Sequence, residues 1–192
     1  MDKHISSIVK TCFHQLREFR HIRSFIPKSA AIIFANAFIH SRIDYCNSLF
    51  YSLPKYSINR LQKIQNSVAR IVTRTSRSSH ITPVLKSLHW LPVQYRINFK
   101  LCCITHRALS LGEPHYLNSL LIHRLNSHSL RSSSFNPLTL PFFNKKSNGF
   151  RSFAYAAPFL WNHLPNTVRS APTYLSVIKS LKTYYFNQAF PT

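Results

Sequence analysis

Two stripes of side chains at helical spacing run along residues 57–74. The apolar stripe consists of Leu61, Ile64, Val68 and Ile71. The basic stripe lies one position earlier and consists of Arg60, Lys63, Arg70 and Arg74, with Ser67 at the remaining step. Steps of three and four residues place each stripe along one side of an α-helix. The pattern therefore predicts an amphipathic helix, N-capped by Ser57, that buries one face and keeps the neighbouring face cationic.

Helical periodicity also covers most of the remaining chain. It predicts helices over residues 4–20, 29–41, 82–88, 93–108, 115–122, 154–164 and 173–188. The apolar stripes of the first and last of these helices are Ile5, Ile8, Cys12 and Leu16, and Leu175, Ile178, Leu181 and Tyr185. The 29–41 helix has few polar positions, so we expect it to be buried on most sides.

The composition of the sequence changes near Leu111, where we place a domain boundary. Residues 138–143 and 150–153 flank an Asn-Lys-Lys-Ser-Asn-Gly turn, which is compatible with a short β-hairpin. We therefore predict a mostly α fold. It consists of a helical bundle over residues 1–111, followed by a small, basic helical region that includes the hairpin over residues 112–192.

The charge of the chain is strongly unbalanced. There are 25 Lys and Arg residues against 4 Asp and Glu residues, so the net charge is 25 − 4 = +21. Nine basic residues and no acidic residue lie between Ser57 and Gly112, and no acidic residue follows Glu113. Such a polycation has too few internal partners to neutralise itself, so polyanions are its expected ligands. We expect nucleic acid as the partner; the less favoured alternatives are an anionic membrane surface and a basic protein without a specific partner.

The composition disfavours most catalytic chemistry. The chain has only two glycines, Gly112 and Gly149, whereas phosphate-binding loops and nucleophile elbows depend on glycine. Nucleases, polymerases and glycosidases need paired carboxylates, and carboxylates are scarce here. Asp44 has no carboxylate neighbour in the sequence, so we interpret it as structural, in a pair with Arg42 or in a local cap. We predict that the protein is not an enzyme and needs no cofactor.

A metal site is the next possibility, because the chain has 11 histidines and 4 cysteines. His106 lies three and four residues after Cys103 and Cys102, so one helix can present two ligands. Zinc needs two more, and only His80 and His89 are near. We predict no metal site, and we interpret the cysteines as reduced and mostly buried.

The N-terminus does not resemble a signal peptide, and the apolar run 29–39 is about half the length needed to cross a bilayer. We therefore expect a soluble, intracellular protein of the nucleus or the cytoplasm.

The basic residues of the 57–112 segment are the candidate nucleic-acid contacts. They are Arg60, Lys63, Arg70, Arg74, Arg77, Lys86, Arg96, Lys100 and Arg107. Lys and Arg side chains on helices and loops bind phosphate oxygens without reading sequence. Trp90 or Tyr95 can stack on a base, although a tryptophan beside such a turn more often packs into a core. The absence of acids from this segment favours binding over a merely solvated basic surface.

Three longer stretches carry a family resemblance. They are SRIDYCNSLFYSLP, LQKIQNSVARIVTRTSRSSHITPVLKSLHWLPVQYRINFK and FAYAAPFLWNHLPNTVRSA. They resemble the segment after the palm in non-LTR retrotransposon (LINE-type) reverse transcriptases of the jockey and chicken-repeat kind, and the resemblance extends from about Ile5 to Phe190. It implies that residues up to about Leu111 correspond to the helical thumb, which grips the primer–template duplex. The remainder resembles the basic C-terminal region of the family.

Other parts of such a reverse transcriptase are absent from the sequence. There are no paired polymerase aspartates, fingers, remainder of the palm, endonuclease or CCHC zinc knuckle. The resemblance therefore implies a non-catalytic fragment of an RNA-directed DNA polymerase that binds the backbone of an RNA–DNA or DNA duplex. The alternative is a structural or interaction remnant without independent function, or a module that docks on a reverse-transcriptase core and exposes apolar surface for it.

Overall fold

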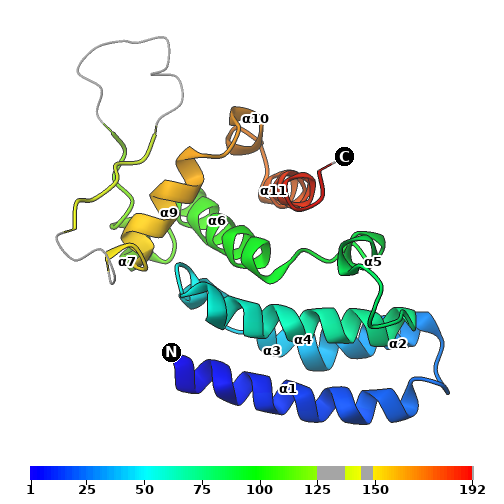
Figure 1. The fold of residues 1–192 in the computed structure, drawn as a ribbon. Coiled ribbons are helices and arrows are strands. Elements are labelled where there is room, and N and C mark those ends of the chain that lie inside the picture. Colours follow the sequence, from blue (N-terminus) through cyan, green and yellow to red (C-terminus); the bar gives the residue numbers. More distant parts are fainter. Residues whose placement is uncertain (125–136, 144–148, 192) are drawn as a thin grey trace. The chain divides into compact units, whose positions relative to one another are not determined.

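Helices make up nearly all the regular structure of this protein (Figure 1). The computed structural model describes residues 1–124, 137–143 and 149–191. The predicted mostly α fold is confirmed. Within the described ranges, no helix is long and apolar enough to cross a membrane.

The chain divides into two compact units. Residues 1–97 and 186–191 form the first, and the second lies within residues 98–185. The division falls inside helix α6 (Val93–Leu111), whereas the sequence predicts a boundary at Leu111, where that helix ends.

The first helix, α1 (Asp2–Ile22), is held in the first unit by one apolar stripe. Its buried residues are Ile5, Ile8, Cys12, Leu16 and Phe19. The predicted stripe is confirmed and extended by Phe19. Steps of three and four residues keep these side chains on one face. Burying each large apolar side chain contributes about 1.5–3 kcal/mol.

The second helical run changes its winding partway along. Helix α2 (Lys28–Phe34) continues into a π-helical turn, η1 (Ala35–His40), and then into α3 (Ser41–Asp44). The fully buried apolar residues of this run are Ala31, Ala35, Ile39 and Ile43. Ile33 and Phe38 are 69% and 48% exposed. The expectation that this run is buried on most sides is therefore wrong, because it packs against its neighbours along a single stripe.

Helix α4 (Lys55–Thr73) follows a 3₁₀ turn, η2 (Asn47–Phe50). Its buried apolar face includes Leu61, Ile64, Val68 and Val72, while Ile71 is only half-buried. The predicted stripe is thus confirmed except at its last step. Ser57 is not the N-cap, since the helix begins at Lys55 after Pro54. Its hydroxyl instead donates to Asp2 Oδ1 at 3.2 Å.

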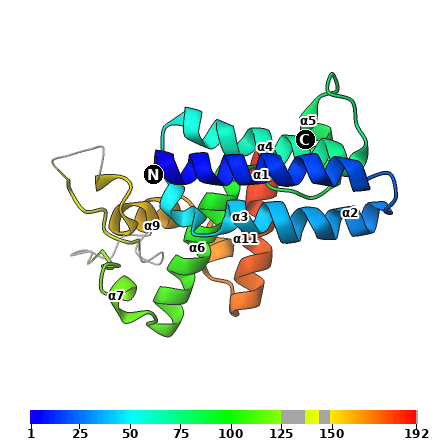
Figure 2. The same ribbon diagram turned by 90° about the horizontal axis from the view of Figure 1, so that it is seen from below.

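Helices α1 and α4 lie side by side and run in the same direction (Figures 1 and 2). Near their N-terminal ends, Arg60 donates to Ser6 Oγ at 3.1 Å. Near their C-terminal ends, Arg23 donates to the carbonyl of Val72 at 2.7 Å. The run from α2 to α3 lies antiparallel to both. Helix α5 (Ile81–Ser87) packs on α4.

Parallel helices bring two C-terminal ends together, and their unpaired carbonyls carry partial negative charge. Two arginines neutralise these ends reciprocally. Arg23, just after α1, donates to the carbonyls of Ile71 and Val72 in the last turn of α4. Arg74, just after α4, donates to the carbonyls of Arg23 and Ser24 at 3.1 and 3.2 Å. This exchange fastens the C-terminal ends of the two helices.

Among its described residues, the second unit contains the later part of α6, three further helices and α11 up to Tyr185. The three helices are α7 (His115–Asn118), α9 (Phe153–Asn162) and α10 (Asn166–Arg169), and α11 spans Tyr174–Ala189. The buried face of α11 includes Val177, Leu181 and Tyr185, whereas Leu175 is 70% exposed. The predicted stripe of this helix is therefore confirmed at Leu181 and Tyr185 and wrong at Leu175, while Ile178 is only half-buried.

The predicted hairpin turn lies mostly outside the described residues. Its described flanks, 138–143 and 150–153, form no ladder with each other, and α9 begins at Phe153. Instead, an isolated bridge joins His123 and Leu138. The side chain of Asn162 holds the backbone of Leu138 through bonds to its N–H and C=O at 2.9 and 2.8 Å.

Candidate nucleic-acid interface

The face of α4 opposite its apolar stripe is polar and basic. A shallow groove of about 410 Å³ on this helix is lined by Tyr56, Asn59, Arg60, Gln62, Lys63 and Asn66. Tyr56 is 55% exposed, and the ammonium group of Lys63 makes no hydrogen bond or ion pair to any described residue. The helix therefore presents an aromatic ring, amides and cations together, a combination suited to nucleic acid.

A second groove, larger than the first, lies where α1, α4 and the loop after α4 meet. We call it the basic groove; it has a volume of about 690 Å³ and is lined by Phe13, Arg20, Ser67, Arg70, Ile71, Thr75 and Arg77. None of these lining residues is acidic. Three guanidinium groups therefore share one surface with the ring of Phe13, which is 48% exposed.

Arg70 fixes the shape of the loop that borders the basic groove. Its guanidinium donates to the carbonyls of Ser76 and Ser79 at 3.3 and 3.0 Å. These bonds hold the two ends of the Ser76–Ser79 turn, so Arg77 is carried on a braced loop. Arg20 and Arg77 make no hydrogen bond or ion pair to the described part of the chain. All of their guanidinium donors are therefore available to a ligand.

Sequence reasoning missed Phe13 and Arg20. The segment rich in basic residues and free of acids is 57–112, whereas α1 contains Glu18. Their only sequence signal is that both lie off the apolar stripe of α1. Their proximity to α4 depends on the packing of two helices about 54 positions apart, which no local pattern reveals.

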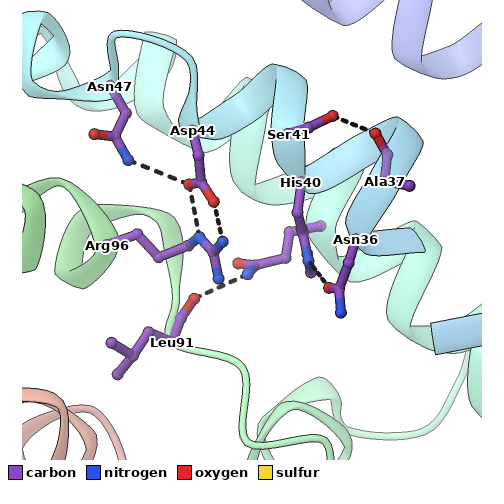
Figure 3. A network of polar contacts seen from close by, with 9 residues as sticks. Asn36, Ala37, His40, Ser41, Asp44, Asn47, Leu91 and Arg96 are labelled. Carbon is purple, nitrogen blue, oxygen red and sulfur yellow. Dashed lines mark hydrogen bonds and ion pairs between the residues drawn. The ribbon is translucent and has the colours of Figure 1, made fainter. Parts of the chain in front are cut away.

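Four of the predicted contacts donate to other groups of the protein: Arg60 and Arg70, as described above, and Arg74 and Arg96. Arg74 is held by the backbone at the end of α1. Arg96 forms an ion pair with both carboxylate oxygens of Asp44, which also accepts a bond from Asn47 at 3.2 Å (Figure 3). Asp44 is thus structural, as the sequence predicts, but its partner is Arg96, 52 positions away, and not Arg42.

The other predicted contacts lie elsewhere on the chain. Lys86 is exposed on α5, and Lys100 and Arg107 are exposed on the part of α6 that belongs to the second unit. The predicted aromatic platforms are also engaged. Trp90 is only 6% exposed, and the Tyr95 hydroxyl donates to the carbonyl of Gln188 at 3.3 Å. The exposed rings of the interface are those of Tyr56 and Phe13.

The candidate metal ligands are Cys102, Cys103 and His106 on α6, and His80 and His89 earlier in the chain. No group of three or more His, Cys, Asp or Glu residues able to hold a metal is found among the described residues. Cys102 contacts the Tyr185 hydroxyl at 3.2 Å, and burial raises its pKa to about 12. Burial likewise raises the pKa of Cys103 to about 11. Both thiols are buried in the folded chain.

His40 lies beside the Asp44–Arg96 pair (Figure 3) and is only 2% exposed. Its Nδ1 is 2.9 Å from Asn36 Oδ1, and its ring meets the edge of Trp90 at a centroid distance of 4.2 Å. Burial, assisted by Arg96 and opposed by Asp44, lowers its pKa from 6.5 to about 3. The ring is therefore neutral in the folded protein at physiological pH.

This histidine predicts a specific loss of stability in acid. An unfolded chain binds a proton at His40 below pH 6.5, but the folded chain does not until the pH approaches 3. The stabilisation is therefore complete above pH 6.5 and declines as the pH falls below it. Between pH 7 and pH 5, His40 should remove about 2 kcal/mol from the free energy of unfolding. Urea unfolding of the wild type and of H40F at both pH values measures this effect. Between pH 7 and pH 5, the free energy of unfolding of H40F should fall by about 2 kcal/mol less than that of the wild type. Equal decreases in the two proteins would refute the prediction.

Comparison with protein-family models, with curated proteins and with solved structures finds no match.

Proposed function

We propose that this chain is a non-catalytic, thumb-like part of a non-LTR retrotransposon reverse transcriptase that binds the backbone of an RNA–DNA or DNA duplex. The basic groove is the observation that carries the proposal. Arg20 and Arg77 offer donors to phosphate, Arg70 braces the loop that carries Arg77, and no lining residue is acidic. A duplex presents regularly spaced phosphates, which such a surface binds without reading sequence.

The position of the groove supports the same proposal. Its walls are two long helices fastened at both ends, by the Arg60–Ser6 bond and by the Arg23–Arg74 exchange. The cations therefore stand on a fixed scaffold and need little ordering when a ligand binds. The groove also lies within residues 1–97, inside the region that resembles the thumb.

The proposal is tested by filter binding of the purified chain to an RNA–DNA hybrid and to a DNA duplex over a series of salt concentrations. Several phosphate contacts release several counterions, so log affinity should fall linearly with log salt, with a slope of about −0.9 per contact for B-DNA. Different duplex sequences should bind within about threefold of one another. A salt-independent affinity, or no binding at low salt, would refute the proposal.

A second candidate is a module that docks on a reverse-transcriptase core. The outward side of α2 and η1 favours it, because Ile33 and Phe38 are exposed there. Phe38 also ends a stack of rings that leads from the core, in which Phe19, Phe34 and Phe38 have centroids 4.4 and 4.6 Å apart. Exposed apolar side chains of this kind are typical of protein interfaces. This candidate replaces the first if the salt series shows no binding.

A further inference from the structure

A separate pocket lies between the first half of α1 and the end of the α2–α3 run. It has a volume of about 360 Å³ and is lined by His4, Ser7, Ile8, Thr11, Ser41, Arg42 and Tyr45. Positions 4, 7 and 11 follow one another at helical steps, so α1 contributes one face of its helix. We call this the anion pocket. It shares no lining residue with the basic groove.

The tertiary structure leaves Arg42 unneutralised beside this pocket. Residues two apart on a helix point in different directions, so Asp44 does not face Arg42. The Asp44 carboxylate is engaged by Arg96 and Asn47 on its own side. Arg42 has no ion pair with any described residue. The positive charge of Arg42 acts on the buried Cys12 thiol. Burial raises the pKa of Cys12 to about 11, and Arg42 opposes that rise.

The remaining polar groups of the pocket suit an anion. Ser7 and Thr11 carry hydroxyl groups that can donate hydrogen bonds, and no carboxylate lines the pocket. The Asp2 carboxylate, at the start of α1, accepts a bond from Ser57 on the α4 side. A guanidinium with several hydroxyl donors is a common setting for phosphate oxygens.

The pocket is larger than a bare phosphate requires and falls at the lower end of the range for small-molecule sites. The ring of Tyr45, 69% exposed, borders it and offers a flat apolar surface. An aromatic ring beside a phosphate-binding group is the arrangement by which proteins stack a base next to its phosphate.

We propose that the anion pocket binds the phosphate monoester of a nucleotide, with Arg42, Ser7 and Thr11 on the phosphate and Tyr45 against the base. The proposal does not depend on duplex binding, because the basic groove uses other residues. Either one can therefore fail while the other stands.

The test is isothermal titration of the full chain, at physiological salt, with inorganic phosphate and with adenosine 5′-monophosphate. R42Q should weaken both by about tenfold or more, since a hydrogen-bonded charge is lost. T11V, which keeps the side-chain shape, should weaken both several-fold. R17Q is the matched control, because it removes one exposed arginine from α1 outside the pocket. It should change either affinity by less than about twofold.

The two ligands distinguish the source of the phosphate. If the nucleotide binds more tightly than inorganic phosphate, and Y45A removes that difference, the nucleotide is supported as the ligand. Equal affinities for the two ligands would overturn the role of the base and leave free phosphate as the ligand. Equal effects of R42Q and R17Q, or no binding of either ligand, would overturn the pocket itself. Retained thermal unfolding of R42Q and T11V, matched to the wild type, confirms that affinity and not folding was changed.

Discussion

Replacing Arg23 with methionine should lower the free energy of unfolding of the first unit by about 3 kcal/mol. Arg23 is 8% exposed, and its guanidinium donates to the carbonyls of Ile26, Ile71 and Val72, with bonds of 2.8 and 2.7 Å to Ile26 and Val72. Methionine keeps the apolar stem but leaves these carbonyls without a donor, and a buried unsatisfied carbonyl costs about 1–3 kcal/mol. The loss also removes positive charge from two helix C-terminal ends.

Urea unfolding measures this effect. Trp90 is buried in the first unit, so its fluorescence in a W161F background reports that unit alone. R17M is the matched control, because Arg17 is exposed on the same helix; it should change the free energy of unfolding by less than about 0.5 kcal/mol. R74M should fall between the two, since Arg74 is exposed. Equal midpoints for R23M and R17M would show that the exchange between helix ends does not stabilise the fold.

The double variant R20Q/R77Q should lose about tenfold or more of its duplex affinity at low salt and reduce the salt slope by about 2. These are the groove arginines that have no partner in the described part of the chain. Removing them leaves Arg70 in place to brace the loop, so the groove keeps its shape. The slope is the sharper measurement, because it counts lost phosphate contacts and does not depend on protein concentration.

The control for this variant is K3Q/K10Q. It removes the same net charge from exposed positions of α1 that do not line the basic groove. If the groove is the binding surface, K3Q/K10Q should keep most of the slope. If the two double variants lose affinity and slope equally, binding is a property of net charge alone and the groove has no special role.

Local sequence patterns predicted a helix well where a single apolar stripe of that helix packs against a neighbouring helix. Both α1 and the buried residues of α4 up to Val68 follow the expected steps, because helical periodicity is a property of neighbouring residues. Prediction was poorer where packing determines exposure. Ile33 and Leu175 are apolar and exposed, and local periodicity does not show which apolar positions a neighbouring element will cover.

The candidate interface was predictable only in part. Arg70 and Arg77 line the basic groove as members of the predicted basic set, and Arg60 and Lys63 line the neighbouring groove on α4. Phe13 and Arg20 were not predicted, because they reach the site through the parallel packing of α1 on α4. Arg96 was predicted as a phosphate contact, but it is paired with Asp44, 52 positions away in the sequence.

The sequence alone determined that the chain is a strongly basic helical protein with a cationic face beside an apolar one. Composition and local periodicity suffice for that. Only the tertiary structure decided which arginines remain available to a ligand, because a guanidinium is engaged or not according to acceptors that are distant in sequence. Asp44 engages Arg96 and leaves Arg42 at the anion pocket. Helix ends engage Arg23 and Arg74, and the basic groove retains Arg20 and Arg77.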